Sequence, residues 1–235
     1  MTVTADTWQA RAALCELLAL SFRYPDDVLV GAIASGEWGE AAEEIAGALG
    51  LAWPADGAPG AAEAAAVDDP DELKHALRAE ATRLFVGAPE PLCSPYEGVW
   101  RAADDGVQAL LFVNPHSMDV ERFCKACGLG RPEGTNEPLD HVATEFELLE
   151  YLALRAAVDA AAEAGDPVED ADEGEPGDVV ASADLPGGSP AAAYDQFMDE
   201  HVRTWTPRFA DKAAEDARLG FYPQAGSLLK AFVAA

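Results

Sequence analysis

Apolar residues recur along this chain at intervals of three and four, the period of an amphipathic α-helix. Residues 5–23 show this most broadly, because Trp8, Leu18 and Phe22 belong to an apolar face wide enough for a central helix. The same period predicts further helices over residues 38–50, 71–86, 96–111 and 117–127. No alternating strand pattern of useful length is present. The pattern therefore predicts an all-α fold, a compact single-domain bundle of roughly eight to ten helices over residues 1–235.

Polar residues and prolines set the expected helix boundaries. Three polar residues suit the N-cap position of predicted helices: Ser117, Asn136 and Ser189. Pro138 and Pro190 would lie in first helical turns, where proline is tolerated. Pro207 should break or kink its helix, so that a short helix begins at Phe209 and a last one carries the C-terminal apolar residues.

Residues 163–190 differ from the rest of the chain in composition. They carry nine acidic residues and no basic one, together with several prolines and glycines. A segment so charged and so poor in apolar groups does not offset its ordering entropy. We therefore expect a disordered acidic insert within the single domain.

The net charge is strongly negative. The chain has 43 acidic and 15 basic residues, which gives −28. Such a protein repels nucleic acid and anionic membranes and favours cationic partners. A salt-rich cytoplasm or a GC-rich genome would explain much of this charge equally well. The N-terminus lacks a secretory signal and no apolar run approaches the length of a membrane span, so we expect a cytoplasmic protein without membrane insertion.

Evidence for catalysis is sparse. Cys124 and Cys127 have the CxxC spacing of a redox pair or half a metal site, so a helical metal- or thiol-dependent enzyme stays an alternative. Both cysteines also lie on an apolar stripe, where a cysteine acts as a small hydrophobe. Glycine-rich phosphate loops and nucleophile elbows are missing, and His201 lies on an apolar face as a core histidine would. We expect no catalytic residues, no metal and no cofactor.

Asp140 and His141 stand out as adjacent polar residues at the start of a predicted helix. Neighbouring helical residues point about 100° apart, so these two do not form a hydrogen-bonded catalytic dyad. Polar residues rarely enter a core unpaired. We therefore expect both side chains to face the surface and to form the polar edge of a binding groove.

An ordered set of short motifs resembles one known family. The motifs are Leu84 to Gly87 followed by Pro91, Ser94 to Trp100, Glu137 to His141, the spaced residues His201, Trp205 and Phe209, and Phe221-Tyr222 followed by Leu228-Leu229. Together they resemble the TorD/DmsD/NarJ family of redox-enzyme maturation chaperones, over roughly residues 8–160 and 190–233.

The resemblance implies both a function and a site. Members of the family bind the N-terminal twin-arginine leader, or an N-terminal segment, of a molybdopterin oxidoreductase catalytic subunit, and they hold it until cofactor insertion. The implied leader site comprises Leu84, Phe85, Pro95, Tyr96, Trp100, Glu137, Asp140 and His141. The client could be a dimethyl sulfoxide, trimethylamine oxide, nitrate or related reductase, and the chaperone a monomer or homodimer.

The physical chemistry of a leader fits these residue types. A twin-arginine leader needs an apolar groove for its apolar stretch and carboxylates for its arginines. Asp140, with Glu97 or Glu137, could supply the carboxylates. For Leu84, Phe85 and Trp100, core packing is the alternative explanation.

Overall fold

The computed structural model describes residues 3–53, 69–107, 114–130, 138–165 and 180–235. Within these ranges every regular element is a helix, and the β-type pairing is an isolated antiparallel bridge between Tyr96 and His141. The α-helices are α1 (Ala5–Phe22), α2 (Asp27–Ser35), α3 (Glu37–Leu49), α5 (Pro70–Ala81), α6 (Glu97–Asp104), α7 (Pro115–Ala126), α8 (Val142–Ala164), α9 (Pro190–Phe197), α10 (Arg203–Asp216) and α11 (Phe221–Val233). Two π-helical turns follow α5 and α9, at Thr82–Val86 and Met198–Val202. The predicted all-α fold is confirmed.

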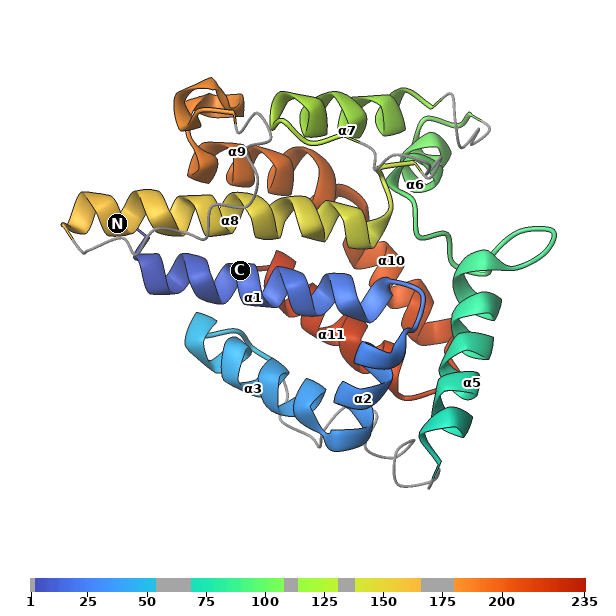
Figure 1. Ribbon diagram of the computed structural model, residues 1–235. Helices are drawn as coiled ribbons and strands as arrows, with labels where there is room; N and C mark the ends of the chain where they lie inside the picture. The colour runs from blue at the N-terminus through green and yellow to red at the C-terminus, as the bar shows by residue number, and fades with distance from the viewer. Residues whose placement is uncertain (1–2, 54–68, 108–113, 131–137, 166–179) are drawn as a thin grey trace.

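Helices α1 and α8 form the centre of the bundle, where they lie antiparallel and pack along their length (Figure 1). Helix α9 packs on α8, α3 packs on α1, and α10 packs on α11. Helix α5 stands at one end of the bundle (Figure 1), where it packs on α2. Leu14 and Leu18 of α1 and Phe146 and Leu149 of α8 have no exposed surface, so the wide apolar face predicted for residues 5–23 is the core seam.

An aromatic cluster closes the core at the α5 end. The rings of Phe22, Phe85, Phe209 and Tyr222 lie 5.2 to 6.4 Å apart between centroids. Phe85 comes from the π-helical turn after α5, and Gly87 then turns the chain away, with φ of 39°. A Cβ at Gly87 would lie 2.7 Å from the backbone of Pro91, which explains the spacing of this glycine and this proline in the sequence.

Helix starts differ from the prediction at two places. Helix α7 begins at Pro115 with Asn114 as its N-cap, and Ser117 lies inside it. Helix α8 begins at Val142 with His141 as its N-cap, so the start predicted at Asn136 is wrong. Ser189 does cap α9, through a hydrogen bond from the backbone N–H of Ala192 (3.1 Å).

Two further predictions about helices in this chain were incomplete or wrong. Helix α2, capped by the Asp26 carboxylate, was not predicted, because its nine residues are apolar on most sides and show no clear period. Helix α10 continues through Pro207, so the new helix predicted at Phe209 does not exist. The Thr206 hydroxyl donates to the carbonyl of Val202 (2.8 Å) in the turn that precedes Pro207.

The predicted disordered insert, residues 163–190, is described only at its ends. Helix α8 continues to Ala164. Short 3-10 turns occupy Ser182–Asp184 and Pro186–Gly188. Arg155 donates to the carbonyl of Val180 (2.7 Å) and so ties the returning chain to α8. The two ends of the segment thus form helical turns, and residues 166–179 lie outside the described residues, so the disorder of the insert stays a prediction.

Candidate functional site

Two of the resembling motifs pair with each other. The Val142 N–H donates to the carbonyl of Pro95 (2.8 Å), and the Glu97 N–H donates to the carbonyl of Asp140 (2.9 Å). Between these two bonds lies the bridge of Tyr96 and His141. Segments far apart in the sequence are thus held side by side at the start of α8.

Asp140 is buried, with 1% of its surface exposed. Its Oδ2 accepts hydrogen bonds from the Gly98 N–H (2.9 Å) and from the Ser117 hydroxyl (2.6 Å). Helix α6 has no side-chain cap from its own N-cap residue, Tyr96, so Asp140 caps α6 from a distant segment. Burial raises the pKa of Asp140, while these hydrogen bonds lower it. The prediction that Asp140 faces the surface is wrong, because the carboxylate finds its partners inside the protein.

Gly98 makes this arrangement possible. A Cβ at this position would overlap the Ser117 hydroxyl and lie 2.9 Å from Asp140 Oδ2. Asn114 approaches from the same side and donates its side-chain N–H to the carbonyl of Gly98 (2.5 Å). The absence of a side chain at Gly98 therefore lets the start of α6 contact both α7 and the Asp140 segment.

Glu97 is also buried and paired. Its Oε2 lies 3.0 Å from Nδ1 of His201, and its Oε1 accepts from Arg101 (2.8 Å). The His201 ring stacks on Phe197 with centroids 4.7 Å apart, which confirms His201 as a core histidine. Glu97 is therefore not available to a client arginine, contrary to one of the predicted roles.

A third buried carboxyl group lies nearby, at Glu145 on α8. Its Oε2 accepts from Trp205 Nε1 (3.1 Å). Burial raises the pKa of Glu145 well above its ordinary value, and the neighbouring Glu97 and Asp140 raise it further. The polar residues of the resembling motifs thus form an internal network that links α6, α8 and α10.

His141 has a different position from Asp140. Its Nδ1 accepts from the Ala143 N–H (3.1 Å), so this nitrogen carries no proton and the imidazole is neutral. Burial lowers the pKa of His141 to about 4. The ring packs edge-to-face against Tyr96, with centroids 5.2 Å apart. His141 is thus a helix cap whose partly buried ring contributes to the adjacent groove.

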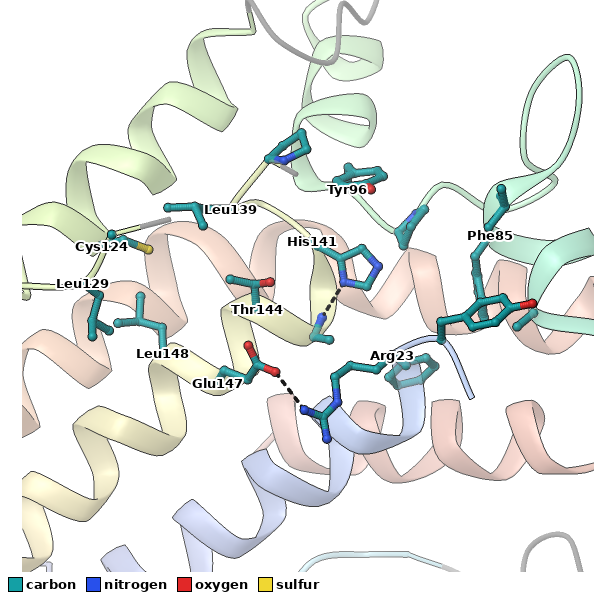
Figure 2. Close-up of a pocket in the computed structure, with 18 residues that line it drawn as sticks. Arg23, Phe85, Tyr96, Cys124, Leu129, Leu139, His141, Thr144, Glu147 and Leu148 are labelled. Carbon is teal, nitrogen blue, oxygen red and sulfur yellow. Dashed lines mark hydrogen bonds and ion pairs between the residues drawn. The ribbon is translucent and has the colours of Figure 1, made fainter. Parts of the chain in front are cut away.

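A groove of about 770 Å³ opens beside these residues. It lies between the end of α1, the turn after α5, the paired motif segments and the first turns of α8. Its lining residues are Phe22, Arg23, Tyr24, Ala81, Phe85, Val86, Pro95, Tyr96, Cys124, Leu129, Gly130, Pro138, Leu139, His141, Ala143, Thr144, Glu147 and Leu148. Figure 2 shows leucines gathered on one side, Phe85 on the other, and His141 and Tyr96 between them. The lining is mainly apolar.

One ion pair lies at the groove. Arg23, directly after α1, places its Nη1 3.4 Å from Oε1 of Glu147 on α8 (Figure 2). Both side chains are about half exposed, at 50% and 44%. Among the described residues, they are the two fully charged residues of the lining.

The predicted site residues separate into two groups. Phe85, Pro95, Tyr96 and His141 line the groove. Those outside its lining are Leu84, which is fully buried, Asp140 and Trp100. Glu137 lies outside the described residues.

Trp100 has a structural role. Its Nε1 donates to the carbonyl of Ser94 (2.8 Å), and its ring packs against Trp205 with centroids 6.5 Å apart. The Arg208 guanidinium lies over the same ring, 5.7 Å from its centroid. These contacts fix the motif segment between α6 and α10 and agree with the packing alternative.

Several lining residues were missed by the sequence analysis. They are Arg23, Tyr24, Leu129, Leu139, Thr144, Glu147 and Leu148. Helical period does place Leu148 and Glu147 on α8, but it does not tell which elements stand opposite them. The signal for Arg23 and Tyr24 was their position at the end of the central helix, just before Pro25.

The cysteines do not have the character of a reactive site. Cys124 and Cys127 are buried, and burial raises their pKa to about 12 and about 11. The thiolate is the form that attacks or binds metal, so a raised pKa disfavours both roles. In the part of the chain that the structure describes, no three His, Cys, Asp or Glu side chains form a metal-binding group. The packing interpretation of the two cysteines fits these observations.

None of the described helices has both the length and the apolar character needed to cross a bilayer.

Comparison with known proteins establishes the family. Residues 35–211, about three quarters of the chain, match the family described as nitrate reductase delta subunit. The chain therefore belongs to this NarJ/TorD family, which is a family of maturation chaperones and not of enzymes. The resemblance inferred from the motifs is confirmed.

Curated relatives of this chain carry the name chaperone protein TorD. The one from Vibrio cholerae serotype O1 (strain M66-2) is 26% identical over 167 residues, which are 71% of this chain and 63% of that protein. The one from Photobacterium profundum is 25% identical over 156 residues, or 66% of this chain and 60% of that protein. The chain thus spans about three fifths of the length of the curated relatives it matches.

A solved structure shares the fold. The structure, described as a redox enzyme maturation protein from Archaeoglobus fulgidus, aligns with a TM-score of 0.52. The alignment covers 96% of this chain and 94% of that one, at 19% identity. This likeness concerns the arrangement of the helices over the whole chain.

Proposed function

We propose that this protein is a cytoplasmic chaperone for the catalytic subunit of a molybdopterin oxidoreductase. It binds the N-terminal twin-arginine leader, or an N-terminal segment, of that subunit and holds it for cofactor insertion, assembly and export. It acts as a monomer or homodimer without inserting into the membrane. The client is a dimethyl sulfoxide, trimethylamine oxide, nitrate or related reductase.

The observation that carries the proposal is the groove beside the paired motif segments. Its volume, about 770 Å³, is within the range of about 300–1,000 Å³ usual for ligand pockets. The exposed Tyr24 and Val86 and the partly buried Leu129 offer apolar surface to the apolar stretch of a leader. The family membership and the names of the relatives support the same role.

The charge of the protein supports a cationic ligand. A net charge of −28 attracts the arginine-bearing head of a leader and increases its rate of encounter. Salt screens such long-range attraction, since the Debye length is about 8 Å at physiological ionic strength. Association should therefore slow as salt is added, while the apolar contacts within the groove persist.

Calorimetric titration with leader peptides of the molybdoenzymes from the same genome tests the proposal. Val86 lines the groove and is exposed, so Val86→Asp should weaken binding about tenfold, which corresponds to about 1.4 kcal/mol. Val158, exposed on α8 and outside the groove lining, is the matched control. Val158→Asp should bind like the wild type. A folded wild type that binds none of the peptides, or equal loss in both variants, would contradict the proposal.

A further inference from the structure

We propose that the carboxylate of Glu147 receives an arginine of the client. In the free protein, Arg23 pairs with this same carboxylate. Client binding then exchanges one guanidinium for another at the same carboxylate. The inference rests on the proposed function, because it concerns the same groove. It adds the residue that pairs with the client arginine and an internal contact that competes with it.

Within the described part of the chain, the groove lining contains one carboxylate that can accept a cation. Among its residues, Glu147 is the carboxylate, since Asp140 and Glu97 are buried in the internal network and are not part of the lining. His141 is a neutral helix cap. An arginine that enters an apolar groove is costly unless it is paired. A leader arginine lying along this groove therefore meets Glu147.

The existing pair is suited to exchange. Nη1 of Arg23 and Oε1 of Glu147 lie 3.4 Å apart with both side chains about half exposed, and such exposed pairs contribute little to stability. Arg23 follows the end of α1, so its long side chain can turn into solvent without moving the helix. The carboxylate can thus change partners at small cost.

The surroundings also favour a second cation. Glu150 and Glu16 stand near the pair, and the pKa of Glu150 is raised by burial first, then by the charges of Glu16 and Glu147. Arg23 acts in the opposite direction on Glu150. Once displaced, the Arg23 guanidinium still has these carboxylates within electrostatic reach. A client arginine at Glu147 therefore reduces the repulsion among these carboxylates, and Arg23 still has opposite charges near it.

The test compares two peptides with four proteins by calorimetry or fluorescence anisotropy. One peptide is the leader with its arginines, and the other has both arginines replaced by glutamine. The proteins are the wild type, Arg23→Gln, Glu147→Gln and the control Lys230→Gln. Lys230 pairs with Asp211 at an exposed site outside the groove lining, so its substitution makes the same change in net charge as Arg23→Gln.

Arg23→Gln should bind the arginine peptide about 1.5- to 5-fold more tightly than the wild type, the range expected for release of an exposed pair. The same variant should bind the glutamine peptide as the wild type does. Glu147→Gln should bind the arginine peptide more weakly and should discriminate less between the two peptides. Lys230→Gln should differ little from the wild type.

Several outcomes would overturn the inference. One is an affinity of Arg23→Gln that is unchanged or lower than that of the wild type. Another is an equal gain in affinity for the arginine peptide in Lys230→Gln, because the change in net charge alone would then explain the effect. Undiminished discrimination in Glu147→Gln would exclude that carboxylate as the acceptor. If the wild type binds the arginine peptide and these results occur, only the exchange is wrong. If the folded wild type binds neither peptide, the proposed function is wrong as well.

Discussion

Replacing Asp140 tests whether this motif residue acts inside the protein or on a client. Asp140→Ala removes the acceptor of two hydrogen bonds, from the Gly98 N–H and the Ser117 hydroxyl, and leaves both donors without this partner. Hydrogen bonds to charged groups contribute about 1.5–3 kcal/mol each. Part of this is offset, because burial raises the pKa of Asp140 and its Oδ1 has no hydrogen-bond partner among the described residues. We expect a net loss of about 2–4 kcal/mol in the free energy of unfolding.

Urea denaturation at neutral pH, followed by circular dichroism, measures this loss. Asp140→Asn is the matched control, since the amide oxygen still accepts from the same donors, and it should stay within about 1 kcal/mol of the wild type. Ser117→Ala should cost about 1 kcal/mol in the wild type and close to nothing in Asp140→Ala, because the two residues share one hydrogen bond.

The opposite result would refute the internal role of Asp140. If Asp140→Ala unfolds within about 0.5 kcal/mol of the wild type, a typical surface effect, the carboxylate does not hold α6 and α7 together. If the same folded variant also loses its affinity for a leader peptide, Asp140 contacts the client directly. Affinity equal to that of the wild type at a temperature where the variant is folded agrees with the structure.

Substitutions at three further positions, Gly98, His141 and Glu145, test the same region. Gly98→Ala should lower the free energy of unfolding by about 1–3 kcal/mol in urea titrations, because its Cβ would overlap the Ser117 hydroxyl. Gly31→Ala is the control, since Gly31 lies in a helix and no atom lies within 4 Å of the new Cβ. This substitution should raise the free energy of unfolding by up to about 1 kcal/mol. His141→Ala should cost about 1 kcal/mol by removing the cap of α8, and His141→Asn should restore most of it. The pKa of His141 is lowered from 6.5 to about 4, so its stabilising contribution is present above pH 6.5 and is lost as the pH falls through 4. The free energy of unfolding of the wild type should therefore fall relative to that of His141→Asn over this interval. A difference that does not change with pH would contradict the assignment. Glu145→Gln should stabilise the protein more at pH 8 than at pH 5. A carboxyl group with a raised pKa contributes stability that is full below its ordinary pKa of 4.5 and is lost as the pH rises through its pKa in the folded protein. A gain in stability that is independent of pH would show that Glu145 does not titrate in this way.

The motif residues have a physical reason to occur together in this chain. Gly98, Asp140 and Glu97 depend on one another. The missing side chain of Gly98 leaves room for the Asp140 carboxylate, which accepts from the Gly98 N–H. The N–H of the buried Glu97 donates to the Asp140 carbonyl. A resemblance between sequences records that residues occur in a set, and it does not separate those that bind a ligand from those that hold the binding segments. This explains why the resemblance led to a groove beside the motif segments and assigned the wrong position to Asp140.

The sequence by itself determined the all-α class, the central helix and the cap of α9. These features depend on residues close in the chain, because the helical period and the capping bond of Ser189 span only a few positions. His201 was assigned correctly for the same reason, from its place on an apolar helix face.

Only the tertiary structure decided which polar residues reach the groove. Asp140 meets its partners 23 and 42 positions away, and Arg23 meets Glu147 across 124 positions. Such contacts depend on how helices pack, and no local period records that packing. The same carboxylate is exposed or buried according to whether distant segments bring donors to it, since burial without partners is costly.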